Sequence, residues 1–326
     1  MGKGNEFAPK PNTLSNKEVG FEQLLSEREK KTNSLVCLGI DPRYDEVPDR
    51  IKHARYLGNS PERHLVHYFS GQIDKVKGSI SSCKLNSAYF EALADQGGFT
   101  SMIKIAQHAK QNGIPVIIDG KRGDTEETSR YYAKAYFEVL QADAVTINIY
   151  GGGSFLRYGK SVFDSIRPYV ENEASTTFIW CASSNDGGGQ IQDLTVDLRD
   201  QDEDYISRFG GYEELAEIVG DYKVKVYQLV AFLASKWNEK GNIGVVAGAT
   251  YPDKIAKIRK IVGDDMTILI PGVGENEQGG NVRRAVRSGV NSIGEGLIIA
   301  SSRGIARDNS FAERLRKEIN TYRLAA

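Results

Sequence analysis

The chain has 326 residues, enough to bury one large hydrophobic core, and α/β barrels reach this size as single domains. Its 42 Lys and Arg residues nearly balance 43 Asp and Glu residues, so charge gives no argument for binding to nucleic acid or to an anionic membrane. Hydrophobic residues make up 40% of the chain, a globular value, and no apolar run approaches the length of a membrane span.

The N-terminal segment and the cysteines favour a cytoplasmic protein. Residues 1–18 are polar, lack the apolar region of a secretion signal, and are predicted to form a flexible tail before a single domain over residues 19–326. Cys37, Cys83 and Cys181 lie in or beside apolar runs, as reduced, buried thiols do. No Cys-x-x-Cys pair occurs and the four His residues are scattered, so the sequence predicts no metal site.

Runs of strand length alternate with helical segments along the chain. Each run is followed by a crossover, which predicts a parallel sheet with helices outside, and eight such runs are the number that closes a (β/α)8 TIM barrel. Two glycines interrupt the eighth run, and residues 185–212, rich in Gly and Asp, are predicted to be irregular, as a lid or an insertion. The predicted strands are 35–40, 80–85, 114–119, 144–148, 176–181, 243–247, 267–271 and 292–296, and the helical segments include 99–111, 127–140, 213–237, 253–262 and 280–288.

The third run ends in three charges with the spacing Asp-x-Lys-x-x-Asp. Asp119 and Lys121 are two residues apart and should share one face of the strand, and Asp124 follows after a Gly turn. Charges at the end of a buried strand are costly unless they pair or act on a ligand, which favours a catalytic site. The alternative is a solvated strand end, in which Asp124-x-x-Glu127 begins the next helix as a capping pair.

Other strand ends carry polar groups as well, where barrel enzymes place their sites. Gly272-Val273-Gly274 and Gln278-Gly279-Gly280 follow the seventh strand, and Arg303 follows the eighth just before a helix. Glycine loops and an Arg at these two loops favour phosphate binding, although the glycines alone are equally typical of turns. The remaining strand-end candidates are Asp41, Lys84, Asn86, Asn148 and Ser184.

Taken in order, these segments resemble the orotidine 5′-phosphate decarboxylase family, in its longer-chain branch whose third strand reads Asp-x-Lys-Arg-Gly-Asp. The matching pieces extend over nearly the whole barrel, and their order on successive strands is specific. They are Leu38-Gly39-Ile40-Asp41-Pro42, Lys84-Leu85-Asn86-Ser87-Ala88-Tyr89-Phe90-Glu91, Asp119-Gly120-Lys121-Arg122-Gly123-Asp124, Val145-Thr146-Ile147-Asn148-Ile149-Tyr150, Val245-Val246-Ala247-Gly248-Ala249-Thr250 and Ser302-Arg303-Gly304-Ile305.

The resemblance implies a carboxy-lyase that forms uridine 5′-phosphate and CO2 without metal or organic cofactor, in the last step of de novo UMP synthesis. It implies that Lys121 donates the proton, that Asp119 lies beside the departing carboxylate, and that Lys84 completes the charge array and contacts the ribose. It further implies a homodimer with shared sites, in which Asp124 and Thr128 reach the neighbouring subunit's ligand. Asp41 would bind ribose hydroxyls, Ser184 the pyrimidine edge, and Arg303, Gln278, Gly279 and Gly280 the phosphate.

Departures from the family pattern leave the four charged positions intact. Thr125 stands where the family usually has an apolar residue, so the wall behind the pyrimidine becomes more polar, and the loop before Gln278 is two residues longer. Two rival functions remain. Sugar-phosphate decarboxylases and hexulose-phosphate synthases of the same superfamily share Asp-x-Lys-x-x-Asp but use Mg2+ held by an acidic residue where this chain has Lys84. A nucleotide-binding paralogue without catalysis is the other.

Overall fold

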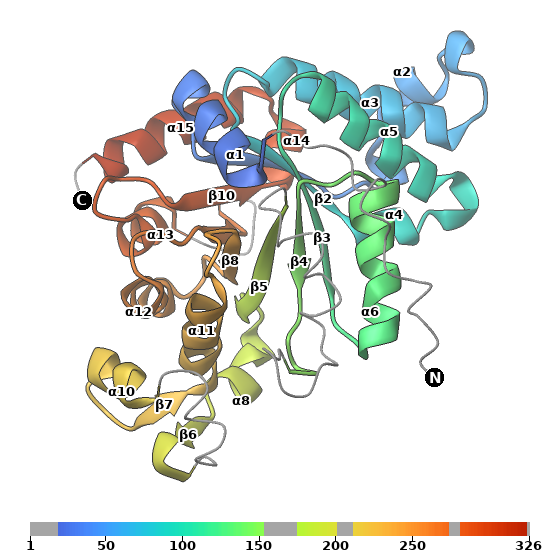
Figure 1. The fold of residues 1–326 in the computed structure, drawn as a ribbon. Coiled ribbons are helices and arrows are strands. Elements are labelled where there is room, and N and C mark those ends of the chain that lie inside the picture. The colour runs from blue at the N-terminus through green and yellow to red at the C-terminus, as the bar shows by residue number, and fades with distance from the viewer. Residues whose placement is uncertain (1–18, 153–174, 201–210, 274–280, 325–326) are drawn as a thin grey trace, which may run out of the picture.

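The barrel predicted from the strand count is present in the computed structural model, which describes residues 19–152, 175–200, 211–273 and 281–324. In these residues eight parallel strands close into a ring in the order β1-β10-β9-β8-β5-β4-β3-β2 (Figure 1). The (β/α)8 prediction is therefore confirmed. The strands are β1 (Val36–Ile40), β2 (Ser82–Asn86), β3 (Val116–Arg122), β4 (Ala144–Ile147), β5 (Thr176–Ala182), β8 (Ile243–Ala247), β9 (Ile268–Pro271) and β10 (Leu297–Ser301).

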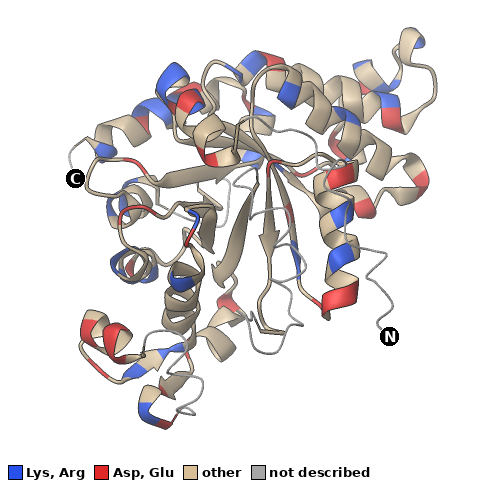
Figure 2. Cartoon of the chain, viewed as in Figure 1, with Lys and Arg blue, Asp and Glu red and all other residues tan. Residues whose placement is uncertain are grey.

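Helices surround the barrel, and Figure 2 shows Lys and Arg positions interspersed with Asp and Glu positions along them. None of the helices in the described residues is both long and apolar enough to cross a membrane. The described residues contain the α-helices α1 (Phe21–Thr32), α2 (Asp49–Lys52), α3 (Pro61–Val76), α4 (Ser87–Glu91), α5 (Gly98–Gln111), α6 (Glu126–Ala133), α8 (Gly189–Gln192), α10 (Glu213–Val219), α11 (Val226–Trp237), α12 (Pro252–Val262), α13 (Val282–Gly289), α14 (Arg303–Arg307) and α15 (Ser310–Arg323).

Alternation along each strand separates two hydrophobic clusters. One side of each strand packs under the helices, as Val145 and Ile147 of β4 do. The other side fills the barrel interior. That interior cluster contains Cys37, Ile117, Ala144, Phe178, Val246, Leu269, Ile298 and Ala300, together with Phe21 and Leu25 of α1.

Helix α1 closes the N-terminal end of the barrel. The ring of Phe21 packs edge-on against Phe178, with centroids 5.8 Å apart. Next to it, Glu22 accepts hydrogen bonds of 3.2 Å from Thr176 and from Thr267, which lie where β5 and β9 begin. A functional site must therefore open at the other end, where the strands finish.

The predicted eighth strand is wrong by five residues. Residues 292–296 form a turn rather than a strand, in which Gly294 and Gly296 both have a φ of 76°. The amide of Glu295 donates to the side-chain oxygen of Asn291 at 2.7 Å, which closes the turn. Because the glycines supply left-handed backbone that a strand does not contain, β10 begins only at Leu297.

Three further element predictions need correction. The single helix over 213–237 is two helices, α10 and α11, separated by Gly220 at φ 86° and by strand β7 (Lys223–Lys225). Residues 185–212 are not wholly irregular, because α8 and β6 (Thr195–Asp197) lie within them and β6 pairs antiparallel with β7; residues 201–210 are outside the described part. The segment 127–140 is α6 followed by a π-helical stretch, Lys134–Val139.

The predictions for 99–111 and 253–262 agree with α5 and α12 to within one residue at each end. Helix α13 begins at Val282, and Gly280, where it was predicted to begin, lies outside the described residues. Residues 1–18 also lie outside them, so the division into a tail and one domain from residue 19 stays a prediction.

Candidate active site

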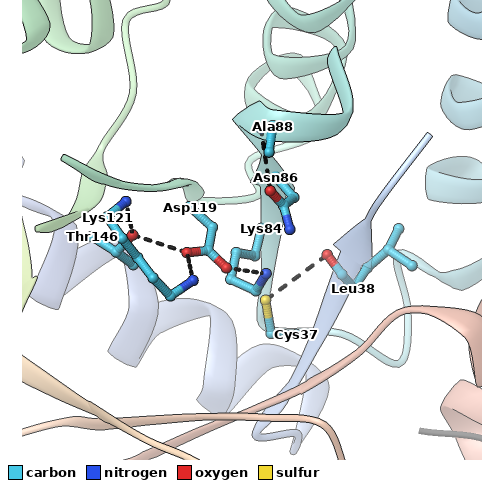
Figure 3. A network of polar contacts seen from close by, with 8 residues as sticks. All are labelled: Cys37, Leu38, Lys84, Asn86, Ala88, Asp119, Lys121 and Thr146. Carbon is cyan, nitrogen blue, oxygen red and sulfur yellow. Dashed lines mark hydrogen bonds and ion pairs between the residues drawn. The ribbon is translucent and has the colours of Figure 1, made fainter. Parts of the chain in front are cut away.

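Three predicted charges meet at the C-terminal end of the barrel (Figure 3). Lys84 extends from β2, and Asp119 and Lys121 extend from β3. The Lys84 ammonium lies 2.7 Å from Asp119 Oδ2, and the Lys121 ammonium lies 2.5 Å from Asp119 Oδ1. A carboxylate thus sits between two ammonium groups, and each ammonium holds a different oxygen.

The side chains of the two lysines differ in their exposure to solvent. The side chains of Lys84 and Asp119 are 5% and 7% exposed, whereas that of Lys121 is 32% exposed. Lys121 therefore carries the more accessible of the two ammonium groups. Its Nζ also lies 6.0 Å from the centroid of the Trp180 ring on β5.

The three groups keep one another charged. Burial alone would raise the pKa of the Asp119 carboxyl, but Lys84 and Lys121 outweigh burial and hold that pKa well below its usual range. Burial alone would lower the pKa of the Lys84 ammonium, but Asp119 and Asp41 outweigh it and raise that pKa. Cys37, in the layer beneath, stays a neutral thiol because burial raises its pKa to about 11.

Lys121 contacts Asp119 because the backbone of β3 is irregular at this point. The sequence predicts a regular strand, in which residues two apart lie on the same face. Between the pairs Ile118↔Val145 and Arg122↔Ile147, β3 advances four residues while β4 advances two. Inside this bulge Lys121 has a φ of 46°, a left-handed conformation that costs a residue with a side chain about 1 kcal/mol. The prediction that the two charges meet is confirmed, but its geometric reason is corrected.

Thr146 of β4 lies opposite the bulge and bonds to both partners. Its hydroxyl accepts from the Lys121 amide at 3.0 Å and donates to Asp119 Oδ1 at 2.9 Å (Figure 3). The residue is fully buried. Sequence reasoning included Thr146 in a strand without assigning it to the site.

A close approach explains the second glycine of the charged motif. A Cβ on Gly123 would lie 2.0 Å from the backbone oxygen of Asn148, which belongs to the segment after β4 and cannot rotate away. Any side chain at this position would therefore separate β3 from β4 next to Lys121.

A cavity of about 520 Å³ opens above the charged groups. This volume suits a small-molecule ligand. One oxygen of Asp41, Oδ1, is buried at the cavity without a hydrogen-bond partner among the described residues, which leaves an acceptor for a ligand hydroxyl. The predicted site residues that line the cavity are Asp41, Lys84, Asn86, Asp119, Lys121, Ser184 and Arg303.

Other predicted residues lie away from this cavity or outside the description. Asp124 and Thr125 are exposed, and neither they nor Thr128 belong to the described lining. The proposed capping pair is wrong, because α6 begins at Glu126 and Asp124 Oδ1 instead accepts from the neighbouring Thr125 amide at 2.7 Å. Gln278, Gly279 and Gly280 are outside the described residues.

The cavity also includes residues that sequence reasoning missed. Trp180 faces inward two residues after Phe178, and the alternation of the fifth strand could have indicated it. Arg43 follows β1 and contacts Glu46 at 3.1 Å and the Tyr89 hydroxyl at 3.2 Å. Arg43 and Tyr89 follow two different strands, and their approach depends on the pairing of β1 with β2, which no local sequence pattern specifies.

Comparison with known proteins shows which family this chain belongs to. Residues 34–317 match the family model of orotidine 5′-phosphate decarboxylase / HUMPS. The orotidine 5′-phosphate decarboxylase of Ralstonia pickettii is 34% identical over 314 residues, which cover 93% of this chain and 99% of the relative. This chain belongs to the orotidine 5′-phosphate decarboxylase / HUMPS family. The orotidine 5′-phosphate decarboxylase of Cellvibrio japonicus is 34% identical over 318 residues, covering 94% of this chain and 100% of that protein.

Solved structures of similar proteins share the barrel. The Leishmania donovani OMP decarboxylase aligns with a TM-score of 0.70 and 28% identity, covering 94% of this chain and 100% of its own. The Leishmania donovani UMP synthase aligns with a TM-score of 0.72 and 30% identity, and this chain spans 57% of that longer chain. The region that matches the decarboxylase / HUMPS family model begins after α1 and includes every described residue that lines the cavity.

Proposed function

We propose that this chain decarboxylates orotidine 5′-phosphate to uridine 5′-phosphate and CO2, the last step of de novo UMP synthesis. The observation that carries the proposal is the series Lys84–Asp119–Lys121, which begins buried and ends with the partly exposed Lys121 ammonium in a nucleotide-sized cavity. Membership in the decarboxylase / HUMPS family and the decarboxylase activity for which the relatives are named support the same reaction.

The charges suit a reaction that leaves an electron pair on carbon. When the ring-to-carboxylate bond breaks, CO2 departs and the pair remains on the ring carbon as a carbanion. A fixed ammonium stabilises that charge without reorganising, because Lys121 is already held by Asp119. Lys121 then gives its proton to the same carbon, which completes the product.

Asp119 acts on the reactant state in this proposal. A substrate carboxylate placed beside the Asp119 carboxylate experiences repulsion that disappears as CO2 leaves. The low pKa of Asp119 means that it stays charged and retains this effect at neutral pH. Lys84 lines the same cavity but is less accessible than Lys121, so we assign it to holding Asp119 and contacting the ribose.

Binding groups surround the charged series. Asp41, whose buried Oδ1 has no hydrogen-bond partner within the described part of the chain, accepts from ribose hydroxyls, and Asn86 lines the same cavity. Ser184 reads the pyrimidine edge, and Arg303, at the start of α14, binds the phosphate with a guanidinium fork. Gln278, Gly279 and Gly280 are proposed as its partners at the phosphate, and Thr125 as part of the pyrimidine wall.

Three finer assignments belong to the same proposal. The length and the Asp-Gly-Lys-Arg-Gly-Asp sequence support placement in the longer-chain branch of the decarboxylases. Exposed Asp124, with Thr128, completes the site of a neighbouring subunit in a homodimer. Three free cysteines are supporting observations for a cytoplasmic enzyme.

The test is an assay of orotidine 5′-phosphate decarboxylation with a strong chelator present, beside a titration of uridine 5′-phosphate binding. We expect turnover that is unchanged by the chelator, together with saturable nucleotide binding. Binding without turnover would identify a non-catalytic paralogue. Turnover only of a sugar phosphate, lost with the chelator, would identify the Mg2+-dependent branch, which the Lys84 ammonium argues against because it would repel the cation.

A further inference from the structure

We propose that Thr146 is a positioning residue for the decarboxylation, because its hydroxyl bonds the Lys121 backbone to the Asp119 carboxylate. The inference rests on the proposed function, since it assigns Thr146 a role through those two residues. It adds a residue of β4 to a site otherwise built from β1, β2, β3 and the later strand ends.

The first step is the backbone of the bulge. Two extra residues of β3 separate its pairing positions with β4, so the Lys121 amide has no place in the regular ladder. An amide that is partly removed from water requires an acceptor, and the Thr146 hydroxyl supplies it at 3.0 Å. This bond holds Lys121 at a φ of 46°, a region that a lysine rarely adopts.

The second step is the carboxylate. A hydroxyl has one proton, and with the Lys121 amide as its donor partner, Thr146 directs that proton to Asp119 Oδ1 at 2.9 Å. The same oxygen receives the Lys121 ammonium at 2.5 Å. Backbone amide, hydroxyl, carboxylate and ammonium therefore form a closed ring that starts and ends at Lys121 (Figure 3).

The ring fixes both the backbone of Lys121 and the ammonium at the tip of its side chain. Without the hydroxyl, the bulge loses the bond that selects its left-handed form, and Asp119 loses one of the three donors that orient it. Displacement of a reacting group by about 1 Å costs roughly a hundredfold in rate. The expected defect thus appears in the chemical step and not in nucleotide binding.

Two substitutions at this position isolate the hydroxyl. Thr146→Val keeps the shape and removes the hydroxyl, whereas Thr146→Ser keeps it. We expect Thr146→Val to lower kcat about 10- to 100-fold, with KM and the Kd for uridine 5′-phosphate within about threefold of wild type. Thr146→Ser should restore kcat to within about threefold.

Thr177 on the adjacent strand provides the matched control. It is fully buried, its hydroxyl has no hydrogen-bond partner among the described residues, and it does not line the cavity. Thr177→Val should therefore leave kcat within about twofold. Equal losses in Thr146→Val and Thr177→Val would show a general effect of buried valines and overturn the inference.

The outcomes also separate this inference from the proposed function. If Lys121→Ala abolishes turnover while Thr146→Val matches wild type in kcat, the role of Thr146 is wrong and the function stands. If Lys121→Ala retains turnover, the assignment of the site itself is wrong. If Thr146→Val does not fold, Thr146→Ala and Thr146→Ser are compared instead, and equal kcat values for those two would overturn the inference.

Discussion

Asp119 is the residue on which the site depends, because three donors from three parts of the backbone converge on its two oxygens. Its side chain is 7% exposed, so the carboxylate that receives these hydrogen bonds is largely removed from water, where each bond is stronger. Removal of any one of them leaves a buried charge with fewer partners. Substitutions around Asp119 should therefore affect rate before they affect the affinity for nucleotide.

Lys121→Ala should abolish decarboxylation while nucleotide binding persists. The change removes both the carbanion's stabilising charge and the proton donor, and we expect kcat/KM to fall at least about a thousandfold, ~4 kcal/mol of transition-state stabilisation. Steady-state assays beside a uridine 5′-phosphate titration measure both quantities. Lys104→Ala, at an exposed lysine paired with Glu62, is the control. A folded Lys121→Ala variant within tenfold of wild type would contradict the assignment.

Arg303→Ala should discriminate between phosphorylated and unphosphorylated substrates. A guanidinium bound to phosphate is worth ~1.5–3 kcal/mol, so kcat/KM for orotidine 5′-phosphate should fall about 10- to 100-fold. The value for the nucleoside orotidine should change by less than about threefold. Arg307→Ala, an exposed arginine that ends the same helix, should affect neither. Equal losses for the two compounds would rule out phosphate recognition by Arg303.

At the residue scale the charged residues of the site could be predicted from the sequence, but the neighbouring residues that bond to them or line the cavity beside them could not. Asp119, Lys121 and Lys84 follow apolar runs, and a charge there is conspicuous. The role of Thr146 could not be recognised from the sequence, because buried threonines are common in strands. Its role arises from the bulge between β3 and β4. Trp180 was likewise interpreted as part of an apolar run, although it faces the cavity.

At the scale of elements, α1 is the part of the fold with the most unusual chemistry. Glu22 is carried on this helix against the barrel interior, where the hydroxyls of Thr176 and Thr267 donate hydrogen bonds to it. Burial raises the pKa of Glu22 from 4.5 to about 7, and the hydrogen bonds from Thr176 and Thr267 offset only part of that rise. The helix thus packs best when Glu22 carries a proton.

The stability of the fold should therefore depend on pH through Glu22. Between pH 4.5 and about 7 the folded chain keeps a proton that the unfolded chain releases, so this contribution to stability is complete below pH 4.5 and is lost as pH rises through about 7. Glu22→Gln cannot titrate. We expect the difference in unfolding free energy, variant minus wild type, to increase by roughly 2 kcal/mol from pH 5 to pH 8.

Chemical denaturation at several pH values measures this difference. Glu27→Gln, at an exposed position on the same helix, should track wild type across the range. If Glu22→Gln and wild type keep a constant difference from pH 5 to pH 8, the carboxyl does not titrate in this window and the assignment is incorrect.

Elements were predictable where hydrophobic periodicity was uninterrupted. The segments of α5 and α12 were found to within one residue at each end because their apolar faces are continuous. The eighth strand and the helix over 213–237 were misplaced at glycines, because Gly220, Gly294 and Gly296 take left-handed backbone that periodicity does not record. The pairing of β6 with β7 joins segments distant in sequence, which no local pattern specifies.

At the scale of the whole molecule, the proposed dimer assigns a role to exposed Asp124. It lies past Gly123, off the described lining of its own cavity, where the chain leaves β3 for α6. A two-fold axis makes any exchange of such a residue reciprocal, which would give two equivalent sites per dimer.

Mixing Lys121→Ala with Asp124→Ala chains should restore activity if sites are shared. Each mixed dimer has one site with both defects and one with neither. Random mixing at equal amounts makes about half of the dimers mixed, so about a quarter of all sites should recover. The control mixes Lys121→Ala with a Lys121→Ala/Asp124→Ala double variant, which contains no intact Lys121 and should stay inactive. No recovery after re-equilibration of the first pair would contradict the shared site.

The closed end of the barrel also determines where other molecules can be attached. Asn320 Nδ2 donates to the Asn33 backbone oxygen at 2.9 Å, which holds the end of α15 beside the end of α1. The described chain thus starts and finishes around the plugged face, while α8, β6 and β7 lie at the opposite end of the molecule (Figure 1). An affinity tag, a surface tether or a fused enzyme module joined next to either helix would extend from the closed N-terminal end of the barrel. In an immobilised form of the protein, the end of the barrel that contains the cavity would then face the solution.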